Sequence, residues 1–136
     1  MFLRIAHIGV AVKDMKKSVG VFQRLFGKSA DHLEEVADQD VQTAHFKIGE
    51  TAIELVSPSG PGSTIAKFIE KRGEGIHHLS FVVENIEAEL QRLKEAGFQL
   101  IDEKPRLGSD GYLVAFLHPK STNGVLVEIS QKQGTT

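Results

Sequence analysis

The chain contains the stretch Ile5-Ala6-His7-Ile8-Gly9-Val10-Ala11-Val12-Lys13-Asp14 and, 71 residues later, the similar stretch Ile76-His77-His78-Leu79-Ser80-Phe81-Val82-Val83-Glu84-Asn85. Each stretch reads as a strand and ends at Asp14 or Asn85, residue types that often begin a helix. A repeat that occurs only twice indicates a duplicated domain, because a solenoid needs about three or more units. The sequence therefore predicts two related modules.

Each module also carries a later apolar run that is interrupted by one acid. These runs are Ala52-Ile53-Glu54-Leu55-Val56 and Val125-Leu126-Val127-Glu128-Ile129. Acidic residues are uncommon within strands, and a buried carboxylate is costly unless it is paired or bound to a metal. His7 and His78 occupy matching places in the first strands. We interpret the two histidines and two glutamates as ligands of one metal ion that both modules share.

The chemistry of these four side chains favours a catalytic metal centre. Two imidazoles and two carboxylates suit Zn, Co, Ni, Mn or Fe(II). Four protein ligands on an octahedral ion leave two adjacent positions open, and open positions are typical of catalytic sites. Strand alternation puts small residues, Gly9 and Ser80, on the faces of the two histidines, which leaves room for a substrate. The bulkier opposite faces are predicted to pack against helices.

The remaining elements are expected in the same order in both modules. Helical spacing of apolar residues follows Asp14 and Asn85, and Gly27 and Gly97 mark the expected helix ends. Further strands are predicted at about 31–36, 41–48, 51–57, 99–104, 112–118 and 124–130. We predict a single α+β domain of two β-α-β-β-β repeats, about 1–57 and 74–131, joined by a loop and connector helix at about 58–73.

Bulk composition excludes several classes of function. The 136 residues fit one domain, and 40% hydrophobic with 25% charged residues is typical of a soluble globular protein. A net charge of −2 gives no electrostatic basis for binding nucleic acid or an anionic membrane. The absence of cysteine excludes disulfides and thiolate metal sites and suits the cytoplasm. We expect neither a signal peptide nor a membrane span.

Other histidines have weaker claims to a role. His77 points away from the face of His78 and is interpreted as structural, whereas His118 ends a strand and is a candidate for lining a pocket mouth. Thr43 and His45 share one face of their predicted strand. His45 is a candidate acid or base if that face looks into a cavity, but the pattern favours exposure to solvent.

Several segments together resemble the vicinal oxygen chelate superfamily, which includes glyoxalase I, extradiol dioxygenases and fosfomycin-resistance proteins. Within it, the chain is similar to the methylmalonyl-CoA epimerases over about residues 5–131. The resemblance is carried by His7-Ile8-Gly9-Val10-Ala11-Val12, Ile65-Ala66-Lys67-Phe68, Arg72-Gly73-Glu74-Gly75-Ile76-His77-His78-Leu79, Leu100-Ile101-Asp102-Glu103-Lys104-Pro105-Arg106, Phe116-Leu117-His118-Pro119-Lys120 and Gly124-Val125-Leu126-Val127-Glu128.

This resemblance implies a cupped, incomplete barrel, usually a homodimer, with a divalent ion such as Co, Zn, Mn or Ni. The implied ligands are His7, Glu54, His78 and Glu128, the same four that the repeat selects. Two departures stand out. Some members carry an acid near the position of Thr43, and many have Gly-Ala-His-Gly where this chain has Gly108-Ser109-Asp110-Gly111.

We therefore expect a metal-dependent epimerase that interconverts (R)- and (S)-methylmalonyl-CoA. Glu54 and Glu128, one from each module, are the candidate proton-transfer groups, with Glu128 the first choice. Candidate contacts to the acyl-CoA substrate are Ser80, His118 and Lys120. The alternatives are a glyoxalase I-type isomerase and a non-catalytic small-molecule-binding module. An extradiol dioxygenase is disfavoured, because those enzymes use two histidines and one carboxylate.

Overall fold

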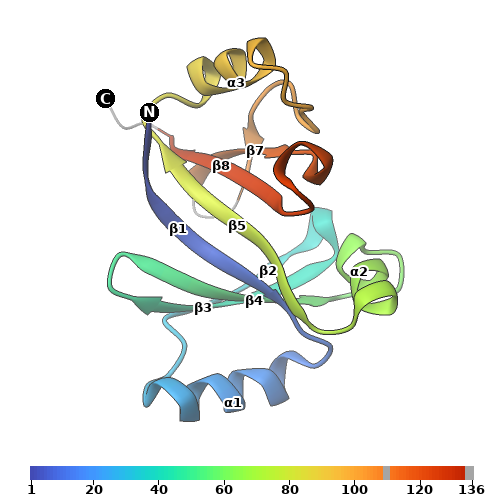
Figure 1. Ribbon diagram of the computed structural model, residues 1–136. Coiled ribbons are helices and arrows are strands. Elements are labelled where there is room, and N and C mark those ends of the chain that lie inside the picture. Colours follow the sequence, from blue (N-terminus) through green and yellow to red (C-terminus); the bar gives the residue numbers. More distant parts are fainter. Residues whose placement is uncertain (109–110, 134–136) are drawn as a thin grey trace. The chain divides into compact units, whose positions relative to one another are not determined.

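The structure is a computed structural model that describes residues 1–108 and 111–133, and Figure 1 colours its ribbon along the chain from blue to red. Two compact units divide the chain. The N-terminal unit is His7–His77, and the C-terminal unit combines Met1–Ala6 with His78–Thr136. The elements are β1 (Phe2–Ala11), α1 (Met15–Phe26), β2 (His32–Val36), η1 (Ala37–Gln39), β3 (Val41–Ile48), β4 (Thr51–Pro58), α2 (Thr64–Arg72), β5 (Gly75–Val83), α3 (Ile86–Glu95), β6 (Arg106–Leu107), β7 (Tyr112–Leu117), η3 (Pro119–Thr122) and β8 (Leu126–Lys132).

In the N-terminal unit the strands follow the order β2-β3-β4-β1, with β4 parallel to β1 and antiparallel to β3. The Asp14 carboxylate caps α1 by accepting from the Lys17 N–H, and Gly27 ends the helix with a left-handed φ of 69°. The apolar face of α1 packs on the strands. This core contains Val10, Val12, Met15, Val19, Phe22, Phe26, Ala30, Ala44, Phe46, Ile53 and Leu55.

The connector helix α2 begins after Ser63, whose hydroxyl accepts from the Ala66 N–H at 3.0 Å. Its buried residues Ile65 and Ile69 pack with residues of β1, β3 and β4 in a second cluster. The predicted connector helix is therefore present, and it covers apolar surface within the N-terminal unit.

In the C-terminal unit the strands follow the order β1-β5-β8-β7-β6, with β5 parallel to β8. Asn85 caps α3 just as Asp14 caps α1, by accepting from the N–H three residues later. The helix packs on β5, β7 and β8. This core consists of Val83, Ile86, Leu90, Leu93, Phe98, Leu100, Leu113, Ala115, Leu117, Val127 and Ile129.

The predicted α+β class and the shared order of elements are confirmed, but the strand expected at 99–104 is wrong. Leu100 forms only an isolated bridge to Leu117, and the edge strand β6 comes later. The carboxylate of Asp102 accepts from the Phe116 N–H at 2.9 Å, and the N–H groups of Ile101 and Asp102 both donate to the Phe116 carbonyl. These contacts use the backbone groups of Phe116 that a regular ladder would need.

Ser109 and Asp110, in the loop where this chain departs from many family members, lie outside the described residues. Among the residues that are described, no helix combines the length and apolar character that a membrane crossing requires.

Candidate functional site

The N-terminal unit brings His7 and Glu54 together on neighbouring parallel strands. Gly9 on β1 lies directly opposite Glu54 on β4. Residues two apart on a strand point to the same face, so His7 shares the face of Glu54. The His7 Nε2 atom lies 3.4 Å from Glu54 Oε1, and the Glu54 side chain is buried. Two of the four predicted ligands therefore meet within this unit.

A third side chain, His45, contacts the other oxygen of the same carboxylate. His45 lies directly opposite Glu54 in the antiparallel pairing of β3 and β4, and its Nε2 atom is 2.9 Å from Glu54 Oε2. The side chain of His45 is only 18% exposed, and its ring meets the ring of His7 edge-on at 6.1 Å. The interpretation of His45 as a solvent-exposed residue is therefore wrong. The Glu54 carboxylate lies between two imidazoles.

The pairing of His45 with Glu54 follows from a short hairpin. β3 ends at Ile48 and β4 begins at Thr51, and Gly49 between them has a left-handed φ of 64°, which favours glycine. Residues equally far from such a turn pair across an antiparallel ladder. The glycine and the two apolar runs were therefore a signal in the sequence for this contact, and the sequence interpretation missed it.

The C-terminal unit repeats the arrangement on β5 and β8. Ser80 lies directly opposite Glu128, and His78 is two residues before Ser80. In the N-terminal unit, Gly9 takes the place of Ser80. His78 and Glu128 are both buried, and the His78 ring meets the Phe116 ring edge-on at 6.2 Å. Each unit thus presents one imidazole and one carboxylate on a shared face, in the same strand register.

Two of the buried hydroxyls on the strands that carry these groups lack a hydrogen-bond partner among the described residues. Ser80 is 0% exposed, and neither Ser80 Oγ nor Thr43 Oγ1 has a hydrogen-bond partner among the described residues. A buried hydroxyl without a partner costs stability and is a common mark of a functional site. Thr43 lies on β3 two residues before His45, and its hydroxyl cannot act as a carboxylate base.

The other candidate residues have local structural partners. His118 accepts from the Lys120 N–H through Nδ1 at 3.1 Å and caps the short helix η3. The His77 ring packs edge-on against Phe68 of α2 at 4.7 Å, as its structural interpretation predicted. A role for His118 or Lys120 in binding substrate stays a prediction.

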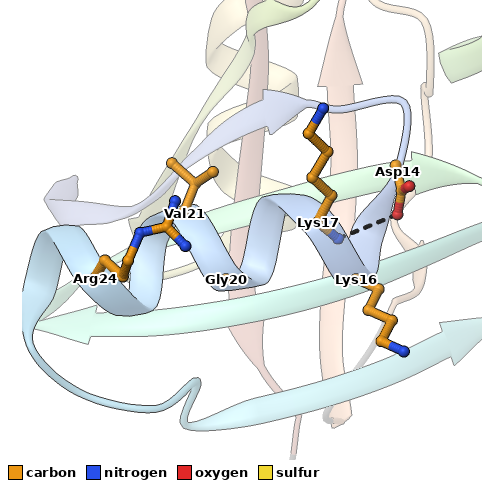
Figure 2. A pocket seen from close by; sticks show the side chains of 6 residues that line it. All are labelled: Asp14, Lys16, Lys17, Gly20, Val21 and Arg24. Atoms are coloured by element: carbon orange, nitrogen blue, oxygen red, sulfur yellow. Dashed lines mark hydrogen bonds between the residues drawn. The ribbon is translucent and has the colours of Figure 1, made fainter.

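A hollow on α1 does not contain these groups. Figure 2 shows side chains along this helix, including Lys16, Lys17 and Arg24, with the hydrogen bond from the Lys17 N–H to Asp14. None of the four predicted ligands lines this hollow. Its lysines and arginine make it a basic surface of the helix.

The donor chemistry of both units fits a divalent metal ion. Imidazole nitrogen and carboxylate oxygen are borderline and hard ligands that suit first-row divalent metals. His7 and Glu54 are the candidate donors in the N-terminal unit, and His78 and Glu128 are the candidate donors in the C-terminal unit. Because these carboxylates are buried, a cation would offset much of the free energy lost when they leave water.

Comparison with known proteins agrees with this chemistry. The sequence profile of the Glyoxalase/Bleomycin resistance protein/Dioxygenase superfamily matches residues 6–116. An ethylmalonyl-CoA/methylmalonyl-CoA epimerase of Cereibacter sphaeroides is 38% identical over 96% of this chain and 99% of its own length. The human mitochondrial methylmalonyl-CoA epimerase is 33% identical over 94% of this chain and 73% of its own length.

Solved structures give the same result. A variant of Streptomyces coelicolor methylmalonyl-CoA epimerase, in complex with 2-nitronate-propionyl-CoA, superimposes with a TM-score of 0.93 at 30% identity. The match covers 99% of this chain and 98% of that chain. The fold expected from the resemblance is therefore confirmed.

Proposed function

We propose that this chain interconverts (R)- and (S)-methylmalonyl-CoA, because it belongs to the methylmalonyl-CoA epimerase family of the glyoxalase/bleomycin resistance protein/dioxygenase superfamily. The observation that carries this proposal within the molecule is the repeated register. Gly9 opposite Glu54 and Ser80 opposite Glu128 put an imidazole and a carboxylate on one face in each unit. Two such pairs supply donors and carboxylates that a metal-assisted proton transfer can use.

His7, Glu54, His78 and Glu128 would hold the metal ion. When bound, a divalent cation would supply Lewis-acid stabilisation, by several kcal/mol, of the negative charge that develops on the substrate oxygens. The four side chains supply two nitrogen and two oxygen donors.

The two glutamates carry out the proton transfers. The α C–H bond of the substrate breaks, its proton moves to the Glu128 carboxylate, and the electron pair delocalises into the thioester carbonyl. A water molecule held by Glu54 then delivers a proton to the opposite side and forms the new C–H bond, and the proton on Glu128 neutralises the hydroxide that remains, so the centre is inverted and no proton is consumed overall. Such general acid and base groups contribute about 10²–10⁴-fold each.

Solvent exchange at the reacting carbon tests this function directly. Purified protein is incubated with methylmalonyl-CoA in D₂O, and mass spectrometry follows deuterium at the α-carbon against a protein-free control. We expect rapid incorporation that a chelator suppresses and added Co²⁺ or Mn²⁺ restores. Exchange at the protein-free rate would refute the epimerase.

Two parallel assays separate the alternatives. Activity on the hemithioacetal of methylglyoxal and glutathione, without exchange of methylmalonyl-CoA, would assign the glyoxalase reaction instead. Small-molecule binding by metal-free protein without turnover of either substrate would assign a binding module.

We also propose a cytoplasmic homodimer as the working form. The support is the family for the dimer and the absence of cysteine for the compartment. Light scattering on the purified protein tests the homodimer, and a measured mass of one chain would refute it. Fractionation of the native cells tests the compartment.

A further inference from the structure

His45 contacts a proposed metal ligand but has no part in the proposed reaction. It contacts Glu54 at 2.9 Å through Nε2, on the oxygen that does not face His7. The two imidazoles therefore contact different oxygens of the carboxylate: Oε1 faces His7, and Oε2 faces His45.

The fold holds His45 in this place. Its neighbours on β3, Ala44 and Phe46, are fully buried in the core beneath α1, so alternation directs His45 to the opposite face. The strand pairing sets it directly across from Glu54, and the tight turn at Gly49 fixes that register. Both side chains are largely buried, at 18% and 10% exposed, so the contact is poorly screened by water.

We propose that His45 is a positioning residue, whose Nε2–H donates to Glu54 Oε2 and thereby orients Oε1 to bind the metal as a single-oxygen ligand. The inference rests on the proposed function, because it takes Glu54 as a ligand. A carboxylate with one oxygen held by a donor cannot rotate freely or offer both oxygens to the ion. Outer partners of this kind typically change metal affinity by about 10–100-fold.

The test measures metal binding and not turnover. Co²⁺ affinity is measured by calorimetry, and the visible absorption of the Co²⁺-loaded protein reports the coordination. We expect His45→Phe, which keeps a ring but no donor, to weaken Co²⁺ binding by about 10–100-fold and to alter the spectrum. His45→Gln, which keeps an N–H donor, restores most of the affinity. Lys47→Gln, an exposed position two residues along β3, leaves both unchanged.

Wild-type affinity and an unaltered spectrum in a folded His45→Phe protein would overturn the inference. If that variant does not fold, NMR of the His45 ring nitrogens in the wild-type protein tests the inference by showing which nitrogen carries the proton. A protonated His45 Nε2 supports the proposal, and an unprotonated Nε2 refutes it. Co²⁺ binding without epimerisation would reject the proposed substrate alone, whereas wild-type protein that binds no Co²⁺ would reject the metal centre and this inference together.

Discussion

Ser80 on β5 lies directly opposite Glu128 on β8, and its fully buried hydroxyl has no hydrogen-bond partner among the described residues. A buried hydroxyl without a partner costs about 1–3 kcal/mol, so a protein selected only for stability would gain by losing it. Its position beside a proposed base makes the Ser80 hydroxyl a candidate for contact with the substrate.

Ser80→Ala should therefore separate stability from substrate binding. We expect the free energy of unfolding to stay unchanged or rise by up to about 1 kcal/mol, because an unpartnered hydroxyl is removed. The KM for methylmalonyl-CoA should rise several-fold. Urea denaturation and steady-state kinetics measure the two effects.

Ser130→Ala is the matched control, because Ser130 is also buried but its hydroxyl donates to the Phe81 carbonyl at 3.4 Å. That variant should lose stability and keep its KM. If Ser80→Ala behaves like Ser130→Ala, the Ser80 hydroxyl serves the fold and not the substrate.

Glu128→Gln should abolish most proton exchange while the fold is kept. The amide has nearly the same shape but cannot accept the α-proton, so deuterium incorporation should fall by at least about 100-fold. Glu84→Gln, at an exposed position in the same unit, should retain full exchange. Exchange within a few-fold of wild type would remove Glu128 from the proposed mechanism.

Glu89 should make stability depend on pH in the acid range. The hydrogen bond from the N-terminal ammonium lowers the pKa of this buried carboxyl below its usual 4.5, and Arg92 lowers the pKa further, although burial acts in the opposite direction. Because the folded-state pKa is the lower one, the stabilisation is complete above the unfolded pKa and is lost as pH falls through the folded pKa.

At about pH 7, Glu89→Gln should lower the free energy of unfolding by about 1–2 kcal/mol, because it weakens hydrogen bonds to charged donors. The difference from wild type should shrink as the pH falls below 4.5. Glu87→Gln, exposed on the same helix, should show no comparable trend. If the difference in free energy of unfolding between Glu89→Gln and wild type stays constant with pH, the ion pair is not the source of that difference.

Asp14→Ala and Asn85→Ala should cost similar stability, because each removes the cap of the helix that follows the repeated strand. Their carboxylate and amide oxygens each accept from an N–H three residues later at 3.1 Å. We expect a loss of about 1 kcal/mol for each in chemical denaturation. Asp14→Asn and Asn85→Asp keep an acceptor and should stay near wild type. If Asp14→Asn and Asn85→Asp lose as much stability as the alanine variants, capping is not the cause.

The sequence alone predicted the duplicated order of elements, the two helix caps and the connector helix, which the structure confirms, and it selected the four residues of the proposed metal centre, which stay a prediction. These features are local, because alternation, helical spacing and capping depend on neighbours along the chain. The histidine and glutamate of each repeat could be recognised because the chain supplies its own second copy for comparison.

Tertiary structure decided the contacts that depend on how distant strands pair. The register that puts Gly9 opposite Glu54, the contact of His45 with that same carboxylate, and the Asp102 hydrogen bond that displaces the expected strand at 99–104 all join residues from different elements. Periodicity gives the face on which a side chain lies, but hydrogen bonding between strands decides which residue it meets. That is why the sequence selected the proposed ligands, and only the fold revealed the histidine that contacts one of them.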